Sequence, residues 1–482
     1  MGVRTGGSRA WLTVGAVAGG LFLAVLSTTL VSVALPAIGR GLDASATDLQ
    51  WVVDAYVIVY ASLLVAGGVL GDRVGRKGVF LLGVGLFAAG ALGCGVAPSV
   101  PVLLAGRVVQ GLGPALLVPG SLTIIRTTFE DARKRALAIG LWSTASGLSL
   151  AAGPALGGVV VAGLGWRWVF LLNVPLAGIL LAVAARVVPR LEANPPGARF
   201  DWGGTVLTTV AVASLTAGII HGQTAGPAAA SVLGAFAVGV AAAAALVLWE
   251  RRCRAPLVDL SLFARPAFVA ANVAALVVFF SFVGAIVYFS GYFQQVQGRT
   301  PVTSGLDVSA IGVAFALAAP LSGRLVGRVG PLPPMLAGLV VGGLATLGLL
   351  RLEPDTGIRA IWWDFVLVGA GIGACLTPMT HTALSAVGRA RAGMASAVHN
   401  AFRQFGQVLG VAVLGLQVYA DVSARGAVGG RLGHADGRRF VDGLHHGVLL
   451  SGVALLAAAG LVAVLSLLQR SRRRDPRRDA AR

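Results

Sequence analysis

The chain carries little charge for its length. Asp, Glu, Lys and Arg make up 12% of the 482 residues, hydrophobic residues make up 56%, and the mean hydropathy is +0.84. Soluble domains carry about 25% charged residues, so a soluble globular protein is excluded. The alternating pattern of membrane β-strands is also absent. Instead, about fourteen apolar runs are long enough to cross a bilayer as helices. The predicted fold class is therefore an all-α integral membrane protein.

Cysteine is scarce as well. Cys94, Cys253 and Cys375 lie far apart, without the spacing of a disulfide framework or a metal site. No phosphate-cradling loop ends in Lys-Ser or Lys-Thr, which argues against ATP as the energy source. No serine–histidine–acid or metal-ligand cluster occurs at a recognisable spacing. We therefore expect no enzyme activity, no catalytic residues, no metal and no cofactor.

Acidic residues are half as frequent as basic ones, 19 against 38, and the net charge is +19. If both termini are cytoplasmic, most of the Lys and Arg residues fall on the cytoplasmic side, as the positive-inside rule requires. The basic run at residues 470–478 then lies beside anionic lipid. No aromatic or folded recognition element accompanies this run, so we expect no nucleic-acid partner. The prediction is a multi-pass plasma-membrane protein.

The apolar runs divide the chain into parts. Residues 1–190 contain six expected helices, residues 191–258 a polar linker and two more helices, residues 259–470 another six, and residues 471–482 a basic cytoplasmic tail. The second half faintly repeats the first, because GRLVGR at residues 323–328 occupies the place of GDRVGR at residues 71–76. Internal repeats of this kind are typical of transporters built from paired six-helix bundles.

A glycine-rich charged loop separates the second and third expected helices. Its key residues are Gly68, Gly71, Asp72, Arg73, Gly75 and Arg76. The aspartate can cap a neighbouring helix or pair with an arginine, and such contacts can break when two bundles move. We expect this loop to gate the protein. The alternative is a cationic anchor that fixes topology.

Two charged residues lie inside expected helices. Arg107 and Gln110 are three residues apart and share a helix face, and a membrane arginine needs an acid, carbonyl groups or water as partners. Asp54 lies about one turn inside the second helix, where partial desolvation favours reversible protonation. We expect Asp54 and Arg107 to couple the protein to protons. The alternatives are an arginine that snorkels to the interface and an aspartate stabilised by the helix dipole.

Small residues line the apolar stretch at residues 147–158. They recur at helical spacing and include a Gly-Pro pair, so a neighbouring helix can approach closely and the helix can bend. The residues are Gly147, Gly153, Pro154, Gly157 and Gly158. The alternative interpretation is a packing kink without a role in transport.

A polar stripe marks the thirteenth expected helix. Asn400, Arg403 and Gln404 share one face of an otherwise apolar helix, so they face a wet cavity or bond to another helix. With Ser27, Ser32 and Gln110 they are our candidates for the lining of a substrate cavity. This cavity is poor in acids and aromatic residues, which favours a neutral or anionic apolar compound over a dication.

These motifs together resemble the fourteen-helix drug:proton antiporters of the major facilitator superfamily, over about residues 12–470. The loop at residues 68–77, the stretch at residues 104–113 and the stretch at residues 147–158 resemble its signature loop, its fourth-helix motif and its antiporter motif. LSTTLVSVALP at residues 26–36 resembles its first-helix motif, but Ser27 stands where many members have aspartate and Ser32 where asparagine is usual.

The resemblance implies two six-helix bundles, two extra helices between them, and a proton-driven antiporter that exports drugs or other small apolar compounds. It implies a small-molecule substrate, protons and lipid as partners, and no obligate protein partner. The missing first-helix acid leaves open an exporter of one specific metabolite or self-made antibiotic, with or without proton coupling. A non-transporting membrane sensor is the third hypothesis.

Overall fold

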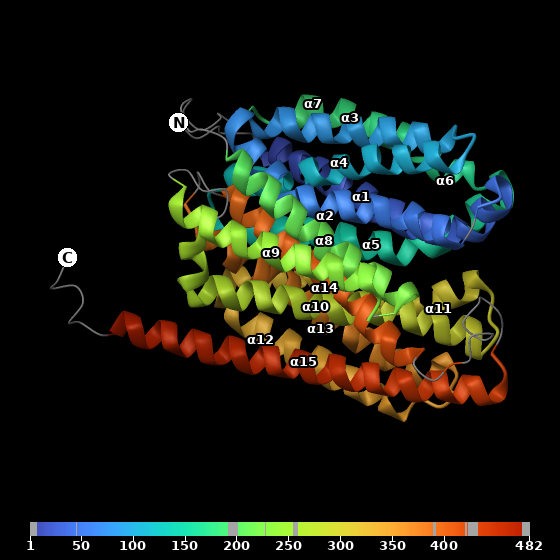
Figure 1. The fold of residues 1–482 in the computed structure, drawn as a ribbon. Helices are drawn as coiled ribbons and strands as arrows, with labels where there is room; N and C mark the ends of the chain where they lie inside the picture. The colour runs from blue at the N-terminus through green and yellow to red at the C-terminus, as the bar shows by residue number, and fades with distance from the viewer. Residues whose placement is uncertain are drawn as a thin grey trace.

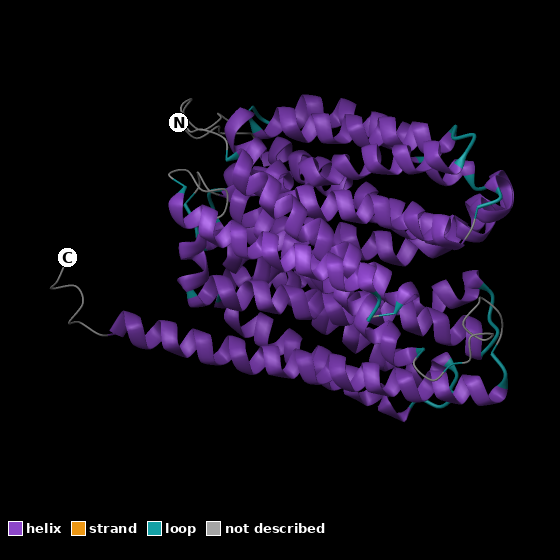
Figure 2. Ribbon diagram, in the orientation of Figure 1, coloured by secondary structure: helices purple, strands orange, loops and turns teal. Residues whose placement is uncertain are grey.

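The described part of the chain consists of helices and connecting loops, and the long helices lie side by side along one direction (Figures 1 and 2). The computed structural model describes residues 7–44, 46–190, 201–226, 228–253, 259–388, 392–419, 422 and 432–474. Most of the polar linker and the end of the basic tail lie outside these residues. Twelve described helical stretches are long and apolar enough to cross a membrane. With α5 and α14, of 33 and 27 residues, the long stretches number fourteen, and the predicted all-α membrane fold is confirmed.

The first half of the chain forms one group of packed helices. Within it α1 and α5, α2 and α4, α3 and α4, α1 and α7, and α3 and α7 are neighbours. The elements are α1 (Gly7–Leu42), α2 (Ala46–Val74), α3 (Arg76–Gly95), α4 (Val100–Thr128), α5 (Ala132–Leu164), α6 (Arg167–Leu171) and α7 (Asn173–Val187).

The sixth expected helix is divided into α6 and α7 at Leu172. Pro175 lies just inside α7 and has no N–H group to bond the carbonyl of Leu171, so the helical hydrogen-bond ladder is interrupted there. The two pieces together still provide one stretch, Arg167–Val187, that is long enough to cross a membrane.

The second half repeats the packing of the first. Here α10 and α14, α11 and α13, α12 and α13, α10 and α15, and α12 and α15 are neighbours, in the same order as the pairs of the first half. The long elements are α10 (Pro266–Gly291), α11 (Pro301–Val329), α12 (Leu332–Gly348), α13 (Ile358–Ser385), α14 (Ala392–Val418) and α15 (His434–Arg474). The short ones are η1 (Leu260–Ala264), η2 (Tyr292–Val296) and η3 (Leu349–Arg351).

The two halves meet mainly along two helix pairs, α5 with α11 and α2 with α14, and α14 also contacts α4. The remaining helices, α8 (Trp202–Ala225) and α9 (Ala230–Arg252), form a hairpin, and α8 contacts both α2 and α14. In Figure 1 this hairpin lies across the middle of the molecule, between the helices of the two halves. The hairpin therefore covers one side of the seam between the halves.

Local signals explain where several helices begin. Asp131 Oδ1 accepts a hydrogen bond of 2.8 Å from the backbone N–H of Lys134 and caps α5, and this bond holds the pKa of the exposed Asp131 carboxyl below its usual value. Asp201 Oδ1 accepts 2.7 Å from the N–H of Gly204 at the start of α8 and 2.8 Å from Trp249 Nε1 of α9. The same carboxylate thus starts α8 and ties it to α9.

The long helices alternate in direction, which defines two ends of the bundle. We call the end where α1 begins and α15 finishes the terminal end, and the opposite end the distal end (Figure 1). The loop between α2 and α3, which carries the glycine-rich charged motif, lies at the terminal end.

Candidate functional site

Asp72 joins the two halves of the molecule at the terminal end. Its carboxylate is 7% exposed and forms an ion pair of 3.1 Å with Arg76 at the start of α3. The same carboxylate accepts hydrogen bonds from the backbone N–H groups of Gly393 and Met394, in the first turn of α14. These N–H groups have no partner within their own helix, so a carboxylate from α2 caps a helix of the opposite half.

Small residues allow this approach. A Cβ atom at Gly393 would overlap the Asp72 carboxylate, and one at Gly68 would lie 2.7 Å from the carbonyl oxygen of Gly393. Gly75 has a φ of 107°, a conformation that favours glycine, where the chain turns from α2 into α3. A Cβ atom at Gly71 would lie 4.0 Å from Cγ of Arg76, and Arg73 is partly exposed.

Further hydrogen bonds between the halves lie at the same end. Arg126 of α4 donates to the carbonyl of Val387 over 2.6 Å, and Arg133 of α5 donates to the carbonyl of Gly327 over 3.0 Å. Ser396 of α14 donates to the carbonyl of Pro119 over 3.0 Å. Gly327 belongs to the second copy of the repeated motif. Both copies therefore lie where the halves meet, and the halves are held together at the terminal end.

The glycines of the apolar stretch serve two different neighbours of α5. A Cβ atom would lie 2.5 Å from the Phe315 ring at Gly147 and 3.0 Å from Val302 at Gly158, so both face α11 of the other half. At Gly153 it would overlap Thr29, and at Gly157 it would lie 3.2 Å from Val33, so these two face α1. The helix continues unbroken through Gly153 and Pro154. Close packing on both sides places α5 between its own half and the other.

Arg107 is fully buried inside the first half. Its Nε donates to the carbonyl of Val52 over 2.7 Å, its Nη1 donates to Gln110 Oε1 over 2.8 Å, and its Cζ lies 4.3 Å from the centroid of the Tyr56 ring. The Nη2 atom is buried without a hydrogen-bond partner. Arg107 thus contacts α2 and Gln110 of its own helix, and it does not extend to the surface.

Ser27 completes this network. Gln110 Nε2 donates to Ser27 Oγ over 3.1 Å, and Ser27 is fully buried. Ser32 lies farther along α1, is exposed, and donates to the carbonyl of Thr28 over 3.0 Å. The structure therefore brings Ser27, Gln110 and Arg107 together and leaves Ser32 apart from them.

Besides Asp54, the acids Asp72, Asp307 and Asp364 lie near the ends of long helices, and the four differ in their partners. Asp72 is paired as described, Asp307 pairs with Arg299, and Asp364 pairs with Arg351. Asp54 of α2 is partly buried, and no hydrogen bond or ion pair joins it to the described residues. Asp54 is therefore the unpaired acid of this set. It forms no ion pair with Arg107, although both belong to the distal half of their helices.

The polar stripe of α14 lies near the seam between the halves. Arg403 is 4% exposed, and its Nη1 donates to Asn400 Oδ1 over 3.1 Å. Gln407 Nε2 donates to Gln404 Oε1 over 2.7 Å, so the stripe bonds along its own helix. His399 is different, because its ring nitrogens lie 3.2 Å from Asn272 Oδ1 and 3.1 Å from Thr380 Oγ1, within the second half.

Aromatic rings surround Arg403. Its Cζ lies 4.3 Å from the centroid of Phe279 of α10 and 5.5 Å from that of Trp142 of α5, and Tyr60 of α2 is within electrostatic range. The sequence predicted a cavity lining with few aromatic residues, and this prediction is wrong around Arg403. The sequence holds one usable signal, since Trp142 lies well inside α5 whereas membrane tryptophans gather at interfaces.

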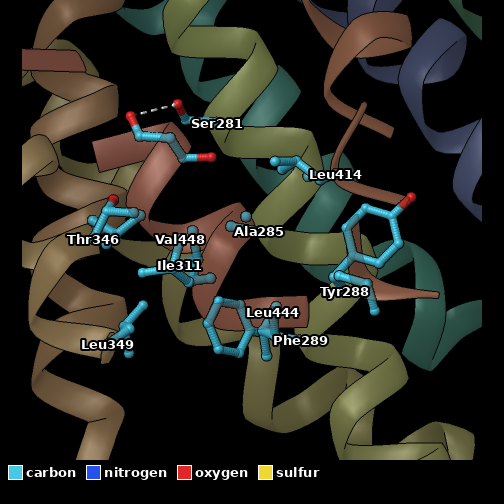
Figure 3. Close-up of a pocket in the computed structure, with 15 residues that line it drawn as sticks. Ser281, Ala285, Tyr288, Phe289, Ile311, Thr346, Leu349, Leu414, Leu444 and Val448 are labelled. Atoms are coloured by element: carbon cyan, nitrogen blue, oxygen red, sulfur yellow. Dashed lines mark hydrogen bonds between the residues drawn. The ribbon is translucent and has the colours of Figure 1, made fainter. Parts of the chain in front are cut away.

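Two cavities lie within the second half, away from the seam. One of about 20 Å³ is lined by largely apolar side chains such as Ile311, Leu349 and Val448, beside a 3.5 Å hydrogen bond from Ser281 to the carbonyl of Ser451 (Figure 3). It has room for about one water molecule. The other, of about 700 Å³, lies at the terminal end and is lined by residues such as Arg265 and His381. Among the described residues, no cluster of His, Cys, Asp or Glu could hold a metal ion.

Two helical halves of like packing, joined along a seam that buries charged and polar side chains, define a membrane transporter of the paired-bundle class. The chain belongs to the Major Facilitator Superfamily, whose family model matches residues 17–411. The structure resembles that of the human organic anion transporter MFSD10, with a TM-score of 0.69. The match covers 94% of this chain and 99% of that chain, at 15% sequence identity. That likeness concerns the fold alone.

Bacterial relatives are more similar in sequence. Multidrug resistance protein Stp of Mycobacterium tuberculosis is 36% identical over 84% of this chain and 75% of its own length. The methylenomycin A resistance protein of Streptomyces coelicolor is 36% identical over 84% and 85%. The tetracenomycin C resistance and export protein of Streptomyces glaucescens is 36% identical over 86% and 77%. The predicted family is confirmed, and the chain is a transporter with relatives that act in drug efflux and antibiotic resistance.

Proposed function

We propose that this chain exports small, largely apolar compounds in exchange for protons, by alternating access in the plasma membrane. The names of its relatives include multidrug resistance and the export of an antibiotic, which supports export as the direction. The terminal end faces the cytoplasm in this proposal, because most Lys and Arg residues belong to the loops at that end. The same names support a second candidate, the export of a single compound.

The contacts between the halves support alternating access. Asp72, Arg126, Arg133 and Ser396 close the terminal end by hydrogen bonds to backbone groups of the opposite half. With the terminal end in the cytoplasm, this is the arrangement in which the cytoplasmic entrance is shut. Breaking these few polar bonds, while the glycine-lined contacts of α5 and α11 let the halves rock, would open it.

The unpaired carboxyl of Asp54 carries the proton-coupling part of the proposal. A proton from outside neutralises this acid, and the loss of charge shifts the balance toward the inward-facing form. Compound binding from the cytoplasm or inner leaflet then favours the outward form and proton release. Arg107 acts as a positioning residue here, because it binds the carbonyl of Val52, two residues before Asp54.

Transport in proteoliposomes with an imposed pH gradient tests the proposal. Efflux of a panel of dyes and antibiotics is compared between the wild type, Asp54→Asn and the control Asp355→Asn, which removes an exposed loop acid at the same end. We expect flux that follows the gradient in the wild type and the control, and a loss of about tenfold or more in Asp54→Asn.

Several outcomes would contradict parts of the proposal. Gradient-driven flux that Asp54→Asn leaves intact would remove Asp54 from the coupling role and favour Asp72, Asp307 or Asp364. Flux that ignores the gradient would indicate an uncoupled exporter, and flux of one compound alone would favour the single-substrate candidate. A complete lack of flux across the panel would favour a narrow natural substrate ahead of the non-transporting sensor.

A further inference from the structure

Arg403 has an uncompensated charge in the middle of the molecule. No ion pair joins it to the described residues, and its Nε atom is buried without a hydrogen-bond partner. Within the described residues its one side-chain hydrogen bond goes to Asn400, which is a neutral group. A buried guanidinium without an acid is costly, because the interior does not replace the hydration that it loses.

Two further buried donors without a partner lie on the helix that faces it. Trp142 Nε1, on the ring that packs against Arg403, has no acceptor in the described part of the chain, and neither has Ser146 Oγ one turn farther along α5. Trp142 is 0% and Ser146 2% exposed. Buried donors in folded proteins are nearly always bonded, so three unpaired ones around one seam indicate a missing acceptor.

The position fits a substrate. Trp142 and Tyr60 come from the first half, and Arg403 and Phe279 from the second, so separation of the halves opens this group of residues. Arg403 lies eleven residues after Ala392, or about 16 Å along α14 at about 1.5 Å per residue. That is near the middle of a hydrocarbon core of about 30 Å, the depth at which paired-bundle transporters bind their substrates.

The geometry fixes which chemistry would bind. Phe279 and Trp142 lie near the guanidinium at cation–π distances and hold it in place, while its N–H donors lie in the plane at its edge. An anionic oxygen group can accept bonds along that edge and from Trp142 Nε1, and the charge assistance makes such bonds strong. A cation would meet Arg403 without an acid to offset the repulsion.

We propose that Arg403, with Trp142 and Phe279, recognises the anionic oxygen group of an aromatic or otherwise apolar organic anion. This proposal rests on the proposed export function and names its substrate class. Arg403 supplies the charge, and Trp142 and Ser146 supply the neighbouring donors. The rings of Phe279 and Trp142 provide apolar surface for the rest of the compound.

Equilibrium binding to the purified full-length protein in nanodiscs tests this without requiring transport. The probes are fluorescein, a planar aromatic anion, and ethidium, a planar aromatic cation, each measured by fluorescence anisotropy. The variants are Arg403→Gln, Arg403→Lys, Trp142→Phe and the control Arg359→Gln. The control removes one positive charge from the exposed start of α13.

We expect the wild type to bind fluorescein more tightly than ethidium. Arg403→Gln should weaken fluorescein binding by about tenfold or more, Arg403→Lys and Trp142→Phe by less, and Arg359→Gln should bind as the wild type does. If Arg403→Gln fails to fold, the other two variants decide the question. Arg403→Lys keeps the positive charge, and Trp142→Phe keeps an aromatic ring.

The proposal is overturned if the wild type does not bind fluorescein, if it binds ethidium more tightly, or if Arg403→Gln and Trp142→Phe bind fluorescein as the wild type does. These results leave the proposed export function untouched, because gradient-driven flux of any other compound would still support it. Conversely, fluorescein binding that depends on Arg403, in a protein that shows no flux, would contradict the export function alone.

Discussion

Gln110 Nε2 donates a hydrogen bond of 3.1 Å to Ser27 Oγ, and this bond ties α4 to α1 deep inside the first half. Gln110 also accepts from Arg107, so one serine ends a chain of hydrogen bonds that begins at a buried cation. Many of the fourteen-helix antiporters that the chain resembles have an aspartate at this position of the first helix. Here a neutral hydroxyl occupies it, and Arg107 Nη2 is left without a partner.

Restoring an acid at this position should change which compounds are exported. In Ser27→Asp the new carboxylate would accept from Gln110 and lie near the unpaired Nη2 of Arg107, which stabilises a buried charge. We expect gradient-driven ethidium export to rise several-fold over the wild type, measured in proteoliposomes. Ser27→Asn is the neutral control of equal size. Equal ethidium export by the Asp and Asn variants would show that the charge at this position does not select the substrate.

Gly393→Ala should prevent the terminal end from closing. The added methyl group would occupy the place of the Asp72 carboxylate, so α14 must move away from α2 and the cap is lost. We expect at least a tenfold loss of transport in a protein that still folds, together with faster thiol labelling of a cysteine introduced at Ser396. Gly388→Ala is the control, since that glycine has open space around it. Normal transport by Gly393→Ala would refute the gating role of this contact.

Gly147→Ala should impair movement at the seam between α5 and α11. Its methyl group would lie 2.5 Å from the Phe315 ring and 3.0 Å from the carbonyl oxygen of Gly312. We expect a lower rate of substrate exchange at unchanged binding affinity, which separates a defect of motion from a defect of the site. Gly163→Ala adds the same methyl group to an open position on the same helix and should behave as the wild type. Matching exchange rates for the two variants would mean that the seam tolerates the extra atom.

The paired acids at the distal end should matter for stability and not for coupling. Asp307→Asn removes the ion pair with Arg299, and Asp364→Asn the pair with Arg351. Because the arginines are 30% and 54% exposed, each pair contributes about 1 kcal/mol or less. We expect slightly lower thermal midpoints and full gradient-driven transport. A variant that transports but no longer responds to the pH gradient would move the proton-carrying role from Asp54 to the substituted acid.

Several features could be read from the sequence because they depend on local patterns. The apolar runs predicted long membrane helices, and the order of the loop, helix and Gly-Pro motifs predicted the superfamily; both are confirmed. The spacing of Arg107 and Gln110 predicted a shared face, and their side chains bond to each other over 2.8 Å. The transport roles of these residues stay predictions.

Other features depended on partners that no local pattern reveals. The sequence suggested that Asp72 could cap some helix, but not that the helix is α14 of the opposite half. It placed Arg403 on a polar stripe, but the surrounding Phe279 and Trp142 come from helices more than a hundred residues away in the chain. It also placed Asp54 and Arg107 in one role, whereas Arg107 binds the backbone beside Asp54 and not its carboxyl.

The sequence by itself determined that this protein crosses the membrane many times and belongs to a transporter family, because hydrophobicity and short motifs act within single helices. The tertiary structure decided which charges are paired and which are not. Pairing depends on how helices of the two halves meet, and those contacts join residues far apart in the chain. The sequence already singled out Asp54, but only the packed helices show that its carboxyl has no partner among the described residues, and only they place Arg403 beside rings from α5 and α10.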